Sequence, residues 1–263
     1  ENSAYYAAYC DYLSRAIMDY SNFQDGYIMV MFKEDSGKRI KAQIKCSKDT
    51  YTFDIHPGRW EVLPFGNGDD KYTVQICENI EGSKYALVLA ATVDVVLRDQ
   101  FAPFIRPNQY VDYAEAVNTV SKAAELCLGL DDALQKVARV YNFVVGNFSY
   151  DTELANNVKS GYVPVLDDVL ASYKGICFDY ASLAASMLRS QGIPTKLIFG
   201  YVGEAYHAWI RVWSDEEGWI DAIFFDGRTW QRMDPTFAAS GKSDESIRAF
   251  TGDGKNYAEK YSY

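Results

Sequence analysis

The sequence has few of the residues that build metal sites and disulfide scaffolds. Only two histidines occur, His56 and His207, and none of the five cysteines forms a Cys-x-x-Cys pair. Structural zinc needs four Cys or His ligands at close spacing, so we expect neither a metal nor another cofactor. Because five is an odd number, at least one thiol stays free even if the others form disulfides.

Positive charge and long apolar runs are also scarce. Lys and Arg number 26 against 36 Asp and Glu, which gives a formal net charge of -10. Nucleic-acid phosphates favour clustered Lys and Arg, so we expect no nucleic-acid partner. The longest apolar stretches, such as 85–93, have the length of strands, whereas a membrane-spanning helix needs about 20 apolar residues. We therefore expect no membrane span; these features leave the oligomeric state open.

The overall composition is that of an ordinary globular protein, with 48% apolar and 24% charged residues. The first residue is Glu1 rather than Met, which fits removal of a signal peptide or trimming of the chain. Together with the β-rich segment described next, this start favours an extracellular or cell-envelope location.

The N-terminal part of the chain shows two patterns. Residues 1–25 predict an amphipathic helix with Ser3 as its N-cap. Its apolar positions recur at helical spacing and are mostly aromatic: Tyr5, Tyr9, Tyr12, Leu13, Ala16, Ile17 and Tyr20. Residues 26–100 consist of short runs rich in Val, Ile, Tyr and Thr, separated by turn sequences such as "HPG" and "GNGDD". This second segment predicts a small, β-rich antiparallel accessory domain.

The remaining part, residues 110–263, begins after a segment with two prolines and no clean period, 98–110, which predicts the domain junction. Two amphipathic helices are expected next, one from about Ala114 to Leu128 and one capped by Asp131 or Asp132. A short helix is expected over 165–172.

One cysteine stands where a helix begins. After Cys177, apolar residues recur at the spacing of a buried helix face, and Gly192 and Pro194 mark the helix end. Backbone N–H groups at a helix start favour a thiolate and stabilise a developing oxyanion, and Gly175 lets the backbone approach a substrate. The simpler interpretation is a buried core cysteine, as expected for Cys127.

A thiolate nucleophile needs a base, and the chain offers few. His207 begins "HAWIRVW", whose alternation predicts a strand that places His207, Trp209, Arg211 and Trp213 on one face. A structural histidine at a sheet edge is the simpler interpretation. His56 precedes "PG" in a turn of the β domain and lacks a plausible partner.

Asp234 ends a further predicted strand, directly before Pro235. A carboxylate in this place would orient the imidazole and stabilise the imidazolium. The simpler interpretation of an Asp-Pro pair is a turn or an N-cap.

These segments together resemble the transglutaminase-like superfamily over roughly residues 114–237. Its hallmark is a Gly-x-Cys helix start, an Arg-x-x-Gly-Ile-Pro helix end, a strand, a His-x-Trp strand and an Asp-Pro strand. The matching residues are Gly175-Ile176-Cys177, Arg189 to Pro194, His207-Ala208-Trp209 and Asp234-Pro235. The segment "VLASYKG" resembles the family's short helix before the nucleophile.

The resemblance implies a papain-like α+β fold, in which the nucleophile's helix packs against an antiparallel sheet that bears the other two groups. It assigns Cys177 as the nucleophile, His207 as base and acid, and Asp234 as the orienting carboxylate. The connection from His207 to Asp234 is longer than in the family, with "FFDGRTW" as an extra hairpin, so Asp221 and Asp226 are rival third members.

The oxyanion donor that relatives supply upstream of the cysteine is not identified by the motifs. Tyr150, in "FSYD", and Tyr173 are the candidates.

The resemblance further implies a cysteine peptidase or amidase that forms a thioester with a protein or peptide substrate. Transglutaminase activity is the alternative, although the calcium-binding residues and accessory domains of animal transglutaminases are not recognisable. An alternative from another class is a catalytically silent binding or scaffold module, in which the β domain or exposed tyrosines bind a partner.

Overall fold

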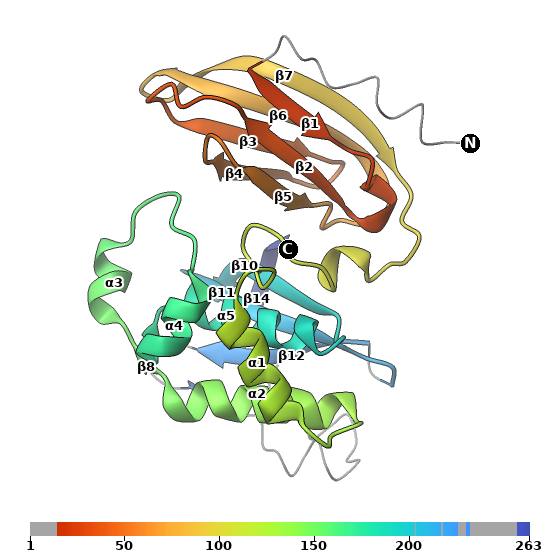
Figure 1. Cartoon of the computed structure of the whole chain (residues 1–263), viewed down its shortest axis with the longest axis vertical. Coiled ribbons are helices and arrows are strands. Elements are labelled where there is room, and N and C mark those ends of the chain that lie inside the picture. Colours follow the sequence, from red (N-terminus) through yellow and green to blue (C-terminus); the bar gives the residue numbers. More distant parts are fainter. Residues whose placement is uncertain (1–14, 203, 217, 226–229, 232–256) are drawn as a thin grey trace. The chain divides into compact units, whose positions relative to one another are not determined.

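The computed structural model describes residues 15–202, 204–216, 218–225, 230–231 and 257–263 (Figure 1). The chain divides into two compact units, Glu1–Pro103 and Phe104–Tyr263, which are described separately below. The division falls inside the segment 98–110, where the proline-containing sequence predicts the junction.

The first unit contains two antiparallel sheets, with strand orders β1-β2-β5 and β4-β3-β6-β7 (Figure 1). Alternate residues of most strands are buried, as in β3, where every second residue lies in the core. Burial of one face of each sheet is what sheet-on-sheet packing requires, so the period-two pattern of the sequence explains the fold. The strands are β1 (Ala16–Asp19), β2 (Tyr27–Phe32), β3 (Ile40–Lys45), β4 (Thr50–Ile55), β5 (Trp60–Pro64), β6 (Asp70–Glu81) and β7 (Lys84–Val95).

The helix predicted over residues 1–25 is wrong at its C-terminal end. Ala16–Asp19 forms strand β1, which pairs antiparallel with Met29–Phe32 of β2. In this strand Ala16 and Met18 are buried and the residues that follow each of them are partly exposed. The strand has only four residues, too few for this alternation to be recognised in the sequence, and pairing with β2 overrides the helical spacing. The rest of the predicted helix, residues 1–14, lies outside the described part of the chain.

The second unit has an α+β fold, as expected. Its five-stranded antiparallel sheet has the order β13-β12-β11-β10-β14. Helix α5 packs against β10 and β11 and also contacts α1, α2 and α4 (Figure 1). The helices are α1 (Val117–Cys127), α2 (Ala133–Asn147), α3 (Thr152–Asn157), α4 (Leu166–Ser172) and α5 (Cys177–Ser190). The strands are β8 (Ser149–Tyr150), β9 (Lys174–Gly175), β10 (Thr195–Val202), β11 (Ala205–Ser214), β12 (Gly218–Phe225), β13 (Trp230–Gln231) and β14 (Tyr257–Ser262).

The expected helix boundaries are largely confirmed. The Asp132 side chain accepts a hydrogen bond from the Gln135 N–H and caps α2. After α5, Gly192 has a φ of 78°, the left-handed conformation expected just past a helix end. The sequence predicts one buried face for α5, whereas all residues from Phe178 to Arg189 are buried, because the sheet and three helices surround it.

The predicted hairpin at "FFDGRTW" is present, since Phe224 and Phe225 of β12 pair with β13. Strand β14, which pairs with β10 at the sheet edge, has no counterpart in the sequence-based prediction.

Arg189 holds together three segments that lie far apart in the sequence. It is buried, and its guanidinium donates to the backbone carbonyls of Thr195 (2.8 Å), Arg106 (2.7 Å) and Tyr263 (2.6 Å). Burial lowers the pKa of Arg189 to about 9, because a charged group loses hydration there. The arginine therefore joins the end of α5 to β10, the end of the chain and the segment that precedes α1.

We expect Arg189→Lys to destabilise the chain by about 2–4 kcal/mol, because an ammonium cannot serve three carbonyls in the fork geometry of a guanidinium. The free energy of unfolding measured in urea checks this. The matched control is Arg139→Lys on the exposed side of α2, expected to change stability by less than about 0.5 kcal/mol. Equal effects of the two substitutions would contradict the role assigned to Arg189.

Candidate active site

Cys177 lies at the first residue of α5, against strand β11. Its sulfur accepts backbone N–H hydrogen bonds from Phe178, in the first turn of α5, and from Ala208 of β11. Ala208 directly follows His207, which is half-buried in the same strand. The fold therefore brings the predicted nucleophile next to the backbone of the residue adjoining the predicted base.

The predicted third member, Asp234, lies outside the described residues, as does its rival Asp226. The other rival, Asp221, lies on β12, and its Oδ1 accepts hydrogen bonds from Trp209 Nε1 at 3.1 Å and Arg211 Nε at 2.6 Å. Arg211 in turn donates to Glu259 at 2.5 Å. Oδ1 of Asp221 is thus engaged by two strong donors, which makes Asp221 part of an ion-pair network across the sheet.

The two tyrosines considered as oxyanion donors lie in different surroundings. Tyr150 of β8 pairs in parallel with Gly175 of β9, and its hydroxyl is close enough to Cys177 for the two ionisations to oppose each other. Tyr173 packs its ring against Phe148 at a centroid distance of 5.1 Å. Of the two candidates, Tyr150 is the one whose pKa is raised by the charge of Cys177.

Tyr173 also has the only positive φ among the described non-glycine residues, 49°. This conformation costs roughly 1–2 kcal/mol for a residue with a side chain. It lets the chain turn from the end of α4 into β9, immediately before the nucleophile. Backbone strain is often found beside functional sites.

Asp179 is the site residue that the sequence-based reasoning missed. Its carboxylate is fully buried, and Oδ2 accepts the Ile176 N–H at 2.7 Å while Oδ1 accepts the Tyr162 hydroxyl at 2.6 Å. An acidic residue at the third position of a helix is a recognised capping signal, so this role could have been predicted. The carboxylate holds the start of α5 and, through Tyr162, the segment between α3 and α4.

This arrangement gives Gly175 a structural role that the sequence did not predict. A Cβ at position 175 would lie 2.6 Å from Cβ and 2.7 Å from Oδ2 of Asp179. The absence of a side chain therefore makes room for the capping carboxylate. Approach of a substrate to the backbone is not needed to explain the glycine.

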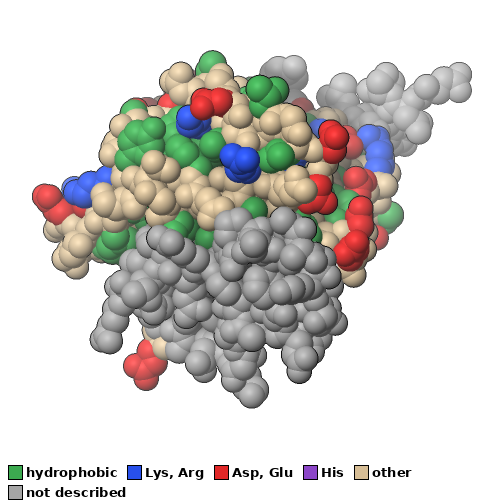
Figure 2. Space-filling view, turned by 90° about the horizontal axis from the view of Figure 1, so that it is seen from below, with side chains coloured by type: hydrophobic (Ala, Val, Ile, Leu, Met, Phe, Trp, Pro, Cys, Tyr) green, Lys and Arg blue, Asp and Glu red, His purple; other side chains and the backbone are tan. Residues whose placement is uncertain are grey.

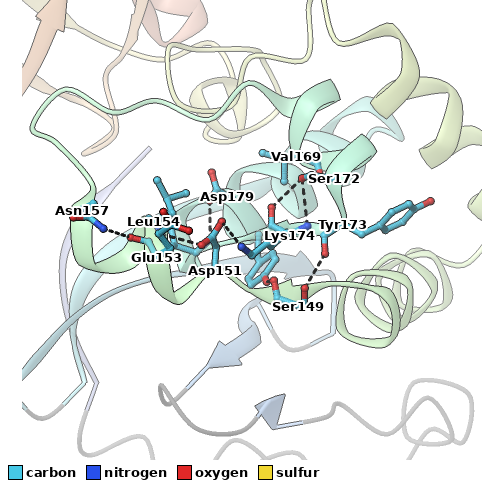
Figure 3. A network of polar contacts seen from close by, with 12 residues as sticks. Ser149, Asp151, Glu153, Leu154, Asn157, Val169, Ser172, Tyr173, Lys174 and Asp179 are labelled. Atoms are coloured by element: carbon cyan, nitrogen blue, oxygen red, sulfur yellow. Dashed lines mark hydrogen bonds and ion pairs between the residues drawn. The ribbon is translucent and has the colours of Figure 1, made fainter.

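A second acidic residue ties the neighbouring segments to each other (Figure 3). Asp151 caps α3 by accepting the Leu154 N–H at 2.9 Å, and it forms an ion pair with Lys174 Nζ at 3.1 Å. Its own N–H donates to the Gly175 carbonyl at 2.8 Å, and the Ser149 N–H donates to the Tyr173 carbonyl at 2.9 Å. The strand that carries Tyr150 is thereby fixed beside the start of α5.

The ionisation of Cys177 differs from the sequence-based expectation. Burial raises the pKa of the thiol, the N–H groups of Ala208 and Phe178 act in the opposite direction, and the charge of Asp179 raises it further. The helix start was expected to favour the thiolate. Desolvation of the thiol and the charge of the nearby carboxylate outweigh the effect of the helix start. Formation of the thiolate therefore needs a positively charged partner.

Elsewhere, His56 has partners, contrary to expectation. Its Nδ1 lies 2.8 Å from Oε1 of Glu61, which also accepts from Arg59 Nε.

Among the described cysteines, Cys46, Cys77, Cys127 and Cys177 are all free. The described residues contain no group of three or more His, Cys, Asp or Glu side chains placed to hold a metal.

In the described part of the chain, no helix combines the length and apolar character needed to cross a membrane. Figure 2 shows one face of the molecule, on which basic, acidic and hydrophobic side chains are interspersed over the coloured surface. That face carries no broad basic area of the kind that binds phosphates.

The model of a family described as Transglutaminase-like superfamily matches residues 120–235. Within it lie the start of α5 and strand β11. Over 125 residues the chain is 27% identical to Uncharacterized protein YebA of Bacillus subtilis (40% of this chain, 17% of that protein). Over 111 residues it is 28% identical to a Protein-glutamine gamma-glutamyltransferase of Pseudomonas aeruginosa (36% of this chain, 15% of that protein).

The matched regions thus span less than a fifth of these curated relatives. A solved structure, the periplasmic domain of TgpA from Pseudomonas aeruginosa bound to ethylmercury, aligns with 89% of this chain and 99% of that one. The sequence identity is 15% and the TM-score is 0.38. The family model and the likeness to the Protein-glutamine gamma-glutamyltransferase agree, so residues 120–235, which include Cys177 and His207, match a domain of the transglutaminase-like superfamily.

Proposed function

We propose that the chain is a cysteine-dependent amide-bond hydrolase, a peptidase or amidase, with Cys177, His207 and Asp234 as its triad. The observation that carries the proposal is the placement of the Cys177 sulfur at the start of α5, against the backbone N–H that follows His207. The family match over 120–235 supports it. An extracellular or cell-envelope location, proposed from the sequence, would give the enzyme protein or peptide substrates there.

The reaction follows from these groups. The His207 imidazole takes the thiol proton, and the Cys177 thiolate attacks the amide carbonyl carbon to form a C–S bond. Collapse of the tetrahedral adduct breaks the C–N bond, and the imidazolium gives its proton to the leaving amine. Water, deprotonated by His207, then hydrolyses the thioester, which releases a carboxylic acid and restores the thiol. Asp234 would hold the imidazole tautomer.

The developing oxyanion needs a hydrogen-bond donor near the sulfur. Tyr150 is the candidate for this role, because β8 pairs with Gly175 of β9 and the ionisation of Tyr150 is opposed by that of Cys177. Burial, followed by the charges of Cys177 and Asp179, raises the pKa of Tyr150, so the hydroxyl keeps its proton at neutral pH and can donate.

Transglutaminase activity is the second candidate, favoured by the likeness to a Protein-glutamine gamma-glutamyltransferase. It differs in one step: a primary amine attacks the thioester in place of water. The raised pKa of Cys177 favours a third outcome, a catalytically silent binding or scaffold module. The three differ in thiol reactivity and in the acceptor, which the following experiments separate.

We expect brief iodoacetamide treatment, followed by intact-mass analysis from pH 5 to 9, to label one thiol rapidly below pH 7. Cys177→Ala should abolish this labelling, and His207→Ala should slow it by about tenfold or more, because the imidazolium stabilises the thiolate. Cys127→Ala is the matched control, since Cys127 is a buried helix cysteine in the same unit. Labelling that rises only near the ordinary thiol pKa of about 8.5 would support the silent module instead.

If Cys177 reacts as expected, glutamine-containing peptides incubated with and without a primary amine separate hydrolysis from transfer. We expect release of ammonia with glutamate as the product even when millimolar amine is present. Amide products with the added amine, detected by mass, would favour the transglutaminase.

We expect Asp179→Asn to move the pH profile of Cys177 alkylation to lower pH. Burial raises the pKa of Asp179, whereas the hydrogen bonds from the Tyr162 hydroxyl and the Ile176 N–H favour its charged form. Because the negative charge raises the thiol pKa, removing it favours the thiolate. Asparagine can still accept one of the two hydrogen bonds through its carbonyl. Alkylation rates at each pH provide the measurement.

The matched control is Asp167→Asn. Asp167 of α4 also accepts backbone and side-chain hydrogen bonds, from Asn118 and Thr119 at the start of α1, without acting on the thiol. Its substitution should leave the profile in place. A purely structural role of Asp179 would show as lower stability with an unmoved profile, which contradicts the electrostatic explanation.

A further inference from the structure

Two partly exposed tyrosines lie on the sheet beside the thiol. Tyr201 of β10 and Tyr206 of β11 are directly opposite each other in the antiparallel register. Their ring centroids are 5.3 Å apart with an interplanar angle of 63°, and the residues are 40% and 52% exposed. Tyr206 contacts Phe199, and Phe199 contacts Phe178, the residue that follows Cys177. The open aromatic pair therefore lies on the part of the sheet that adjoins the start of α5.

The pair rests on a continuous set of aromatic rings. Tyr206 stacks on Phe199 at 5.9 Å and 18°, and Phe199 meets the edge of Phe178 at 4.9 Å and 70°. Phe178 directly follows Cys177 and also contacts Tyr162, which Asp179 holds by its hydroxyl. Side chains supported in this way keep their orientation, so a bound ring would lose little further freedom in the protein.

The charge around the pair favours an uncharged occupant. Burial, followed by the neighbouring Tyr261, Tyr201 and Cys177, raises the pKa of Tyr206 to about 12, so its hydroxyl is neutral at physiological pH. The groups that raise this pKa are two tyrosines and the thiol, and two charged residues close by in the chain, Glu204 in the β10–β11 turn and Lys260 beside Tyr261, have opposite signs. Lys260 Nζ lies over the Tyr261 ring at 5.2 Å, which leaves Tyr201 and Tyr206 as the open rings of this group.

We propose that Tyr201 and Tyr206, supported by Phe199, form a subsite for an aromatic or large aliphatic side chain that a peptide substrate carries close to the amide attacked by Cys177. Tilted and stacked ring contacts with such a side chain add to the area that it buries. The inference rests on the proposed cysteine-hydrolase function, because it assumes that the acyl group binds at the sulfur.

The test compares electrophiles that share one reactive group and differ in what they carry. N-(2-phenylethyl)iodoacetamide and iodoacetamide are reacted with the full chain at one pH, and second-order rate constants for Cys177 are taken from intact mass. We expect the ratio of the two rates to exceed that for free N-acetylcysteine by about 5- to 10-fold, as an aromatic contact predicts. Tyr206→Ala and Tyr201→Ala should each reduce this ratio toward the free-thiol value, and Tyr206→Phe should keep it.

Tyr85→Ala is the matched control, because Tyr85 is a partly buried tyrosine on a strand of the first unit. It should leave the ratio unchanged. Two further probes carry a cationic aminoethyl group or a glucosyl group on the same iodoacetamide. A stronger preference for either one would overturn the assignment to a neutral apolar side chain.

Failure of the subsite and failure of the proposed function give different results. Rapid labelling of Cys177 by both probes, with a ratio equal to that of the free thiol or unaffected by Tyr206→Ala, overturns the subsite and leaves the nucleophile in place. Slow labelling by every probe, with the pH dependence of an ordinary thiol, contradicts the proposed function itself.

Discussion

The buried carboxylate of Asp179 is the interaction on which the arrangement of the site depends. It accepts the Ile176 N–H and the Tyr162 hydroxyl, and it occupies the space left by the missing side chain of Gly175. A buried carboxylate is costly unless its oxygens are satisfied, so the cap, the glycine and the tyrosine form one unit. The same charge raises the pKa of the thiol beside it. The feature that positions the start of α5 thus also opposes the ionisation of Cys177.

The raised pKa of Cys177 defines what the proposed base, His207, must do. A helix start alone would favour the thiolate, yet burial and Asp179 outweigh it at Cys177. Activation then depends on a positively charged imidazolium, and His207 lies next to the residue whose N–H reaches the sulfur. A thiol that ionises only with its histidine partner is protected from unspecific oxidation and alkylation. The contacting rings of Tyr206, Phe199 and Phe178 end at the residue that follows this thiol, and in the proposed subsite they would select the acyl group.

The structure differs from the sequence-based expectations at several residues for one physical reason: local patterns carry no information about long-range partners. Ala16–Asp19 has helical spacing but pairs as a strand, because β2 offers an open edge there. Gly175 was interpreted through a substrate, and the structure adds a different neighbour, the side chain of Asp179 in the first turn of α5. His56 was expected to lack a partner and contacts Glu61 across a turn. Strand β14 joins the sheet by pairing with β10, and no periodic pattern in the sequence predicts this pairing.

The sequence by itself determined the elements and the residue types of the site. Short runs rich in Val, Ile, Tyr and Thr between turn sequences predicted β2 to β7, and helical spacing and caps predicted α1, α2, α4 and α5. Short motifs singled out Cys177 and His207. Each of these signals is local. Only the tertiary structure decided which groups act on the ionisation of the sulfur: its burial, the Ala208 N–H and the Asp179 charge. Reactivity depends on burial and on charges brought together from distant segments, and these exist only once α5 has packed against β11.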